Sequence, residues 1–181
     1  MLIANRKREE NIAEYLLYMW QVEDIIRANN LDIDLIEKNI ISQFEQPDNV
    51  KQEIRQWYED LIEMMKHDGV QESGHLQVNR NIIINLTDLH NELLGDSKQT
   101  DYNAAYYKTL PYIVELRARG VDKNEPEIET CFSALYGFLL LRMQNKQVSG
   151  ETQVAISQIS SFLRLLAIKY KLYKDGELEL Q

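Results

Sequence analysis

The stretch Glu10–Asn30, ENIAEYLLYMWQVEDIIRANN, decides the fold class, because apolar or aromatic residues occupy all positions from 15 to 20. At about 100° per residue, the apolar side chains of this stretch fall on one continuous stripe of an α-helix. The stripe consists of Ile12, Tyr15, Met19, Val22 and Ile26, and it is widened by Leu16, Tyr18, Trp20 and Ile25. Such a helix is apolar around well over half of its circumference, whereas a surface helix shows an apolar arc of about 100°. It therefore has to be covered from two directions.

Leu17 raises the question of what supplies the second cover. It lies nearly opposite the centre of the stripe, close to Gln21 and Asp24 in helical projection. An apolar patch left open to water is unusual for a soluble monomer. We therefore expect a homodimer or partner interface that includes Leu17, Tyr18 and Trp20. The alternative is a central helix that its own chain covers on both sides.

Glu23 falls inside the apolar stripe, between Met19 and Ile26 in projection. A buried carboxylate without a partner is costly, so we expect this side chain to be paired or partly hydrated. Arg27, one helical turn away, is the expected structural partner. The functional alternative is a carboxylate that lines a pocket and has a raised pKa.

Gly, Pro and Asn residues that commonly end helices divide the chain into about seven helical segments. The expected segments are 5–28, 32–44 with Asp32 or Asp34 as the N-cap, 47–69, 75–94, 101–120, 126–143 and 150–174. Asn124 or Glu125 is expected to cap the segment 126–143, with Pro126 in its first turn. No alternating β pattern lasts long enough to compete with these helical periods. The sequence therefore predicts an all-α fold, a single-domain helical bundle that covers residues 1–181.

Two of these segments carry further expectations. Pro111 lies inside the segment 101–120, where a proline removes a backbone hydrogen bond and predicts a kink or a break. The segment Ile128–Met143 has a narrow polar arc, which predicts the most buried helix of the protein. Gly137 in that arc is expected to let another backbone approach closely.

Composition excludes several classes of function. The sequence has 20 Lys and Arg against 29 Asp and Glu, a formal charge of -9, and a surface this negative repels phosphate backbones. Acidic residues interrupt and follow the apolar run at 15–20, unlike an export signal, and no segment approaches the roughly 20 apolar residues of a membrane span. A single cysteine, Cys131, fits a reducing compartment. We expect a cytoplasmic protein that binds neither nucleic acid nor membranes.

The three histidines do not form a recognisable metal motif. His67-Asp68 matches the dipeptide of helical metal-dependent phosphohydrolases, but no earlier histidine ligand precedes it. Glu72 and His75 have the Glu-x-x-His spacing of di-iron bundles, which need two such motifs on continuous helices. The motif occurs once here, and Ser73-Gly74 predicts a loop. His90 lies at the edge of an apolar helix face. The sequence therefore predicts no metal site, no cofactor and no catalytic residue.

Tyrosines cluster around the proline of the fifth segment, as Tyr102, Tyr106, Tyr107 and Tyr112. A tyrosine has an apolar ring and a polar tip, so such a cluster could line a groove for a ligand or peptide. Packing at the edge of the core, with hydrated hydroxyl groups, is the structural alternative.

The N-terminal stretch ENIAEYLLYMWQVED resembles the start of a bacterial family of uncharacterised all-helical proteins, a domain of unknown function. The resemblance extends over essentially the whole chain. It implies a helical fold and a bacterial intracellular setting. It assigns no catalytic residue.

Two classes of function remain open. The first is a non-catalytic interaction or scaffold module that binds another copy of itself or another protein, because the apolar helix faces are wide and no catalytic constellation is present. The second is a helical ligand-binding protein or metal-dependent enzyme. Its pocket would lie near the tyrosine cluster (Tyr102, Tyr106 and Tyr112), His90 and Glu23. A shared fold class does not decide between them.

Overall fold

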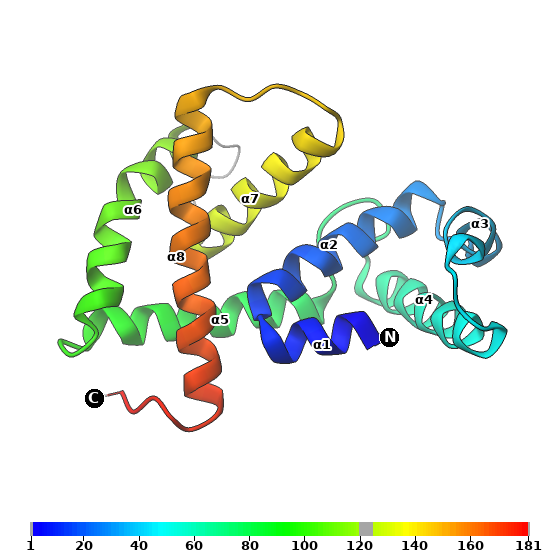
Figure 1. Cartoon of the computed structure of the whole chain (residues 1–181), viewed down its shortest axis with the longest axis horizontal. Helices are drawn as coiled ribbons and strands as arrows, with labels where there is room; N and C mark the ends of the chain where they lie inside the picture. Colours follow the sequence, from blue (N-terminus) through cyan, green and yellow to red (C-terminus); the bar gives the residue numbers. More distant parts are fainter. Residues whose placement is uncertain (1, 120–124, 181) are drawn as a thin grey trace. The chain divides into compact units, whose positions relative to one another are not determined.

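The structure of the chain, a computed structural model, describes residues 2–119 and 125–180 (Figure 1). These residues form eight α-helices and one short 3₁₀-helix and contain no strand, which confirms the all-α prediction. The elements are α1 (Leu2–Glu10), α2 (Ile12–Ala28), α3 (Ile33–Asn39), η1 (Ile41–Gln43), α4 (Asp48–Asp68), α5 (Gln77–Gly95), α6 (Thr100–Arg119), α7 (Glu127–Met143) and α8 (Gly150–Lys174). None of these helices combines the length and the apolar character that crossing a membrane requires.

The first expected segment is two helices, because Asn11 interrupts it between α1 and α2. The Oδ1 atom of Asn11 accepts a hydrogen bond of 3.0 Å from the backbone N–H of Ala13. A short polar side chain that bonds to the nearby backbone in this way starts a new helix. The expectation of one helix over 5–28 is therefore wrong at its beginning, whereas its end at Ala28 is confirmed.

Most other helix ends follow the local signals in the sequence. Asp32 is the N-cap of α3, because its carboxylate accepts hydrogen bonds from two backbone N–H groups of the first turn. Gly69 ends α4 with a left-handed backbone at φ +71°. Pro126 is the residue before α7 and not part of its first turn as expected. Asn124, the other expected capping residue besides Glu125, lies outside the described residues.

α6 runs through Pro111 without interruption, so of the expected kink or break the break is wrong, and the kink stays a prediction. A proline removes only one backbone hydrogen bond from a helix. α6 packs against both α7 and α8, and these contacts support the helix.

The contacts within the chain divide it into two compact units. The first unit comprises Met1–Glu10 and Glu14–Asn81, and it holds α1, α3, η1, α4, most of α2 and the beginning of α5. α3 packs against η1 and α4. Fully buried side chains form its core, among them Ile26, Ile36, Ile41, Met65 and Leu76.

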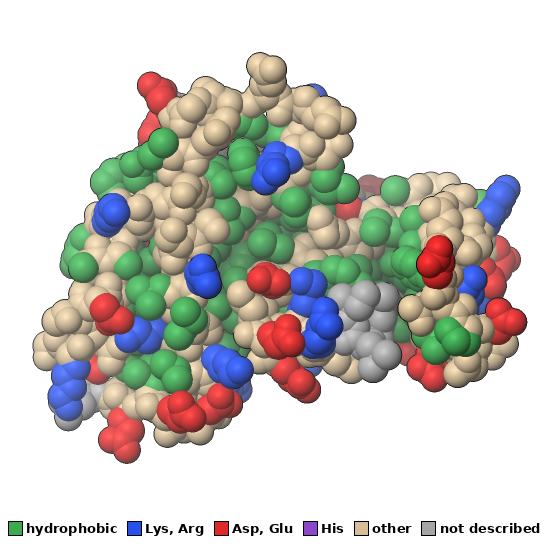
Figure 2. All heavy atoms as spheres, viewed as in Figure 1, with side chains coloured by type: hydrophobic (Ala, Val, Ile, Leu, Met, Phe, Trp, Pro, Cys, Tyr) green, Lys and Arg blue, Asp and Glu red, His purple; other side chains and the backbone are tan. Residues whose placement is uncertain are grey.

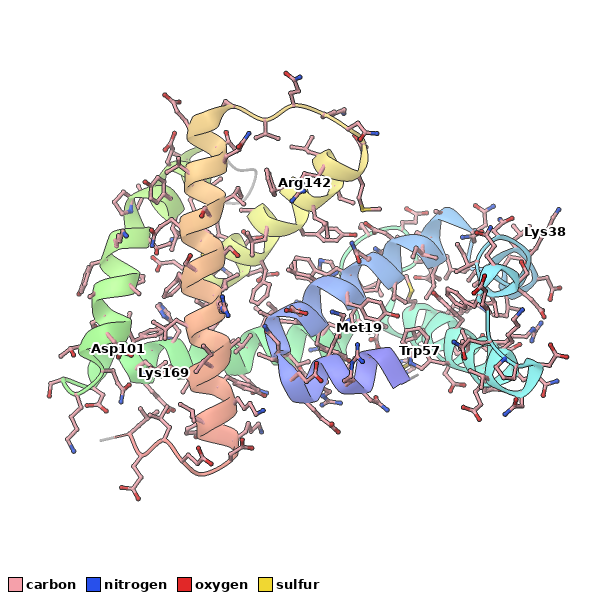
Figure 3. All side chains as sticks on the ribbon, in the orientation of Figure 1. Met19, Lys38, Trp57, Asp101, Arg142 and Lys169 are labelled. Atoms are coloured by element: carbon pink, nitrogen blue, oxygen red, sulfur yellow. The ribbon has the colours of Figure 1, made fainter. Side chains whose placement is uncertain are left out.

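The second unit comprises Asn11–Ala13 and Ile82–Gln181, and α8 packs against α6 and α7 within it. Figure 3 shows Asp101 of α6 next to Lys169 of α8, whose Nζ atom lies 3.0 Å from the carboxylate. The hydrogen bond from Lys169 lowers the pKa of Asp101. The core of this unit contains Tyr102, Ile113, Phe132, Ile159 and Phe162.

The second half of α7 departs from the expectation that this helix is the most buried. The buried residues of the whole helix all lie near the start of α7, and they are Ile128, Thr130, Cys131 and Phe132. Residues 134–140 are only half-buried, and residues 141–143 are exposed. Nothing lies within 4 Å of the position that a Cβ atom of Gly137 would take, so no backbone approaches it closely.

Gly69→Ala should lower the free energy of unfolding by about 1 kcal/mol, because the left-handed backbone at this position strains any residue with a Cβ atom. The added methyl group itself meets no neighbour within 4 Å, so backbone strain is the whole effect. Urea denaturation followed by circular dichroism measures the difference.

Gly95→Ala is the matched control, since Gly95 ends α5 without a positive φ and also has open space around it. Its stability should equal or slightly exceed that of the parent protein. Equal losses in both variants would contradict the role assigned to the Gly69 backbone.

Candidate functional site

Glu23 of α2 is fully buried, and it accepts three hydrogen bonds from residues at the beginning of α5 and just before it. The donors are the backbone N–H of Leu76 at 3.1 Å, the side-chain amide of Asn79 at 2.7 Å and the Nδ1 atom of His75 at 2.6 Å. All four residues belong to the first unit. A buried carboxylate is stable when its oxygen atoms are satisfied in this way. The expectation that Glu23 is paired therefore holds, with partners that differ from the expected one.

Arg27, the expected partner, lies at the edge of this cluster. Its guanidinium approaches the Glu23 carboxylate only to 4.0 Å. It forms an ion pair of 2.8 Å with Asp24 and donates hydrogen bonds to the backbone carbonyl groups of Val70 and Gly74. Arg27 therefore mainly holds the turn 70–74 against α2.

His75 connects the carboxylate to an aromatic side chain. Its ring stacks on Trp20 with the centroids 3.9 Å apart and the planes inclined by 9°. The bends at residues 71–74 confirm the expected loop around Ser73-Gly74, which excludes a continuous di-iron helix. A carboxylate that binds one nitrogen of an imidazole can orient a general base, but acid–base catalysis also needs a reacting group within reach. The Glu23–His75 pair therefore has a structural role, which is to hold the residues before α5 against α2.

His90, Tyr102 and Tyr106, three residues of the candidate pocket, come together in the second unit. The Nδ1 atom of His90 lies 2.7 Å from the hydroxyl oxygen of Tyr102, and the His90 ring packs edge-on against Tyr106 and Phe162. His90 is 4% exposed and Tyr102 is fully buried. Burial lowers the pKa of His90 and raises the pKa of Tyr102. This cluster packs the core between α5, α6 and α8.

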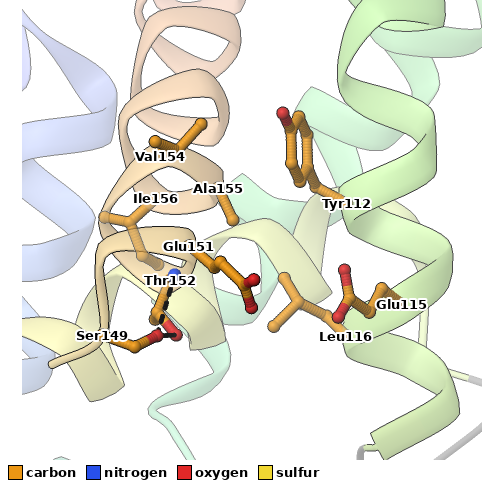
Figure 4. Close-up of a pocket in the computed structure, with 9 residues that line it drawn as sticks. All are labelled: Tyr112, Glu115, Leu116, Ser149, Glu151, Thr152, Val154, Ala155 and Ile156. Atoms are coloured by element: carbon orange, nitrogen blue, oxygen red, sulfur yellow. Dashed lines mark hydrogen bonds between the residues drawn. The ribbon is translucent and has the colours of Figure 1, made fainter.

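Tyr106 and Tyr112 have different surroundings. The hydroxyl of Tyr106 donates a hydrogen bond of 2.9 Å to Glu127 of α7, and burial, with the nearby carboxylate, raises the pKa of Tyr106 to about 12. Tyr112 lines a groove of about 380 Å³ between α6 and α8 (Figure 4). The residues of the expected pocket therefore lie in three different places. Glu23 lies in a buried hydrogen-bonded cluster, His90, Tyr102 and Tyr106 lie in an aromatic core, and Tyr112 lines an open groove.

The three expected interface residues are not equally accessible. Leu17 and Tyr18 are half-buried, and burial raises the pKa of Tyr18. Trp20 is only 2% exposed and stacks on His75 within its own unit. The ring of Trp20 therefore contributes to the core of that unit.

His67 and Cys131, the other residues considered for chemistry, have surroundings that fit a structural role. His67 is exposed, and its Nδ1 atom lies 3.1 Å from the carboxylate of Asp68. Cys131 is fully buried, and burial raises the pKa of its thiol, which makes it a poor nucleophile. Across residues 2–119 and 125–180, no group of three or more His, Cys, Asp or Glu side chains is placed to hold a metal ion.

A comparison with known protein families shows which family the chain belongs to. The family described as a domain of unknown function, DUF4924, matches residues 1–177. The chain belongs to the DUF4924 family. This result confirms the resemblance to a helical family without an assigned function. No curated protein and no solved structure is significantly similar to this DUF4924 chain.

Glu23→Gln should lower the free energy of unfolding of this DUF4924 protein by about 2–3 kcal/mol, because an amide cannot accept all three hydrogen bonds. Thermal and urea denaturation measure the loss. Glu14→Gln is the control, since Glu14 forms a surface ion pair with Lys7 and its loss should cost less than about 1 kcal/mol. If both variants were as stable as the parent, the Glu23 cluster would not hold this unit together.

His90 makes stability depend on pH. Its pKa in the folded protein is below the ordinary value of 6.5, so between these two values the unfolded chain binds more protons than the folded chain. The contribution of His90 is complete above about pH 6.5 and is lost as the pH falls toward its folded pKa. Urea denaturation at about pH 7.5 and about pH 5.5 should show this loss in the parent and a smaller one in His90→Gln. The exposed His67→Gln variant should keep the parent's pH dependence, and a result in which both variants match the parent would refute this assignment.

Proposed function

We propose that this protein is a non-catalytic interaction module that associates with a second copy of itself through the second half of α7. The observation that carries the proposal is the exposure of this apolar segment. Residues 134–140 of α7 are half-buried, and Leu141 and Met143 are 36% and 65% exposed. Hydrophobic side chains reach the surface over α7 in Figure 2. An exposed apolar patch on a soluble protein commonly marks a protein–protein contact.

Three apolar residues of this segment follow the spacing of a helix-pairing surface. Tyr136, Leu140 and Met143 are separated by four and three residues, so they share one side of α7. This alternation of four and three is the repeat with which one helix packs along another. Gly137 lies beside this stripe with open space around it, which would let a partner helix approach closely.

A second copy of the chain fits this stripe better than an unrelated partner. In a two-fold symmetric contact the same surface serves both sides, so one stripe is sufficient. The first turn of α7 is acidic and its last turn carries Arg142, which Figure 3 shows on this helix. An antiparallel pair through the second half of α7 would keep the two acidic first turns at opposite ends of the contact. This arrangement opposes the repulsion expected between two chains with a charge of -9.

The face around Leu17 and Tyr18 on α2 is the second candidate for self-association. Both side chains are half-buried, and both belong to the interface expected from the sequence. Because α2 and α7 carry different candidate faces, one charged substitution on each helix identifies the face that is used.

Met143→Glu should weaken self-association at least tenfold while the protein stays folded, because it places a charge in an apolar contact on an already exposed position. Sedimentation velocity over a range of concentrations should show a parent species of twice the 21.3 kDa chain mass and a variant that dissociates. Circular dichroism checks that the helices remain.

Ile168→Glu is the matched control, since Ile168 is 49% exposed on α8 and lies off the α7 stripe. It should associate like the parent. Dissociation by Leu17→Glu alone would move the interface to α2. A parent protein that stays monomeric at its highest soluble concentration would refute self-association.

A further inference from the structure

The outer face of α6 carries a line of exposed apolar side chains. The side of α6 that packs into the second unit holds the buried residues Tyr102, Tyr106, Thr109 and Ile113. On nearly the opposite side, Tyr107 and Val114 are 65% and 57% exposed. With three further exposed residues they form the α6 stripe, which consists of Ala104, Tyr107, Pro111, Val114 and Ala118. Hydrophobic side chains reach the surface along α6 in Figure 2.

The α6 stripe has the spacing along which two helices pair. Its successive members are separated by three, four, three and four residues. This alternation is the repeat of the seam between two packed helices, whereas the core side of α6 already faces its own unit. An apolar line of this kind that stays exposed in the single chain indicates a contact with another chain.

The side chains of the stripe complement one another when two copies of α6 run in opposite directions. In an antiparallel pair, a step forward along one helix is a step backward along the other. A register that places Tyr107 of one copy against Ala118 of the second copy therefore also places Pro111 against Val114. The largest side chain of the stripe then meets one of the smallest, and small and large side chains in facing positions fill a seam without gaps.

The charges at the edge of the stripe complement one another in the same arrangement. Lys108 and Glu115 each follow a stripe residue by one position, so they lie on the same edge, and both are exposed. An antiparallel pair brings this edge of one helix to the same edge of the other, and Lys108 then faces Glu115 of the second copy at two symmetric places. Glu115 also has an interaction within its own chain, and a carboxylate accepts bonds from more than one donor. A parallel pair would not bring this edge to itself.

We propose that α6 pairs with α6 of a second copy, antiparallel, about a two-fold axis between Pro111 and Val114. The contact is separate from the proposed self-association through α7 and does not depend on it. Where both contacts form, α6 would join one α7 dimer to the next. Most side chains of the α6 stripe are small, so the contact buries less apolar area and forms at higher protein concentration than the α7 contact.

The Met143→Glu variant isolates the α6 contact, because it removes the stronger association through α7. Sedimentation equilibrium up to the highest soluble concentration of this variant should show a species of twice the 21.3 kDa chain mass. Adding Val114→Glu should weaken the association about tenfold, since it places a charge inside the apolar seam. Ile84→Glu is the matched control, because Ile84 is 52% exposed on α5 and lies off the stripe. Circular dichroism checks that each variant is folded.

A charge exchange in the same Met143→Glu background tests the antiparallel register. Lys108→Glu alone should weaken the association about tenfold, because it sets two carboxylates against each other. Lys108→Glu with Glu115→Lys recreates the opposite pair and should restore the association. Lys98→Glu, at an exposed position before α6, changes the net charge as Lys108→Glu does and should have little effect. An exchange that restores nothing would refute the antiparallel pairing.

The same measurements separate the two proposed contacts. A Met143→Glu variant that stays monomeric at every concentration, while the parent forms a dimer, would refute the α6 contact and leave the α7 contact intact. A parent dimer that Val114→Glu dissociates and Met143→Glu does not would overturn the α7 contact and support the α6 contact. Equal losses with Val114→Glu and Ile84→Glu would refute the stripe, since any added charge would then have the same effect.

Discussion

The buried charge of Glu23 is the constraint on which the first unit depends. A carboxylate inside an apolar helix face has to find donors in its own surroundings, because water does not reach it. The loop before α5 and the first turn of that helix supply them, and to do so they have to place His75, Leu76 and Asn79 at one point on α2. Arg27 also holds this loop, through the backbone carbonyl groups of Val70 and Gly74. Directional bonds thus determine where this loop lies, whereas apolar packing alone would tolerate several positions.

The second unit depends on aromatic packing with a few polar links. His90 and Tyr102 satisfy each other inside the core, and Lys169 joins α8 to the beginning of α6 through Gln99 and Asp101. Farther along α6 and α8 these links give way to the open groove, and the second half of α7 is left partly uncovered. The surface proposed for self-association, on the second half of α7, therefore lies where the internal contacts of the unit end.

Local signals explain what could be predicted from the sequence. The stop at Gly69 and the cap at Asp32 need only the backbone preferences of neighbouring residues. Asn11 was missed because asparagine is tolerated inside a helix as well as at its start. The Glu23–His75 bond joins residues 52 positions apart, and no spacing in the sequence indicates such a pair. The burial of Trp20 against His75 is not predictable from the sequence either, because periodicity shows which side of a helix is apolar but not what covers it.

The buried position of Cys131 makes the local opening of the second unit measurable. The thiol is the single cysteine of the sequence and is fully buried, so a modifying reagent reaches it only when the packing around the start of α7 opens. The modification rate at high reagent concentration is then the opening rate itself, and at low concentration it reflects how often the open form is populated. No thiol belongs to the first unit. The rate of thiol modification therefore reports on the local opening of the second unit, without a contribution from the first.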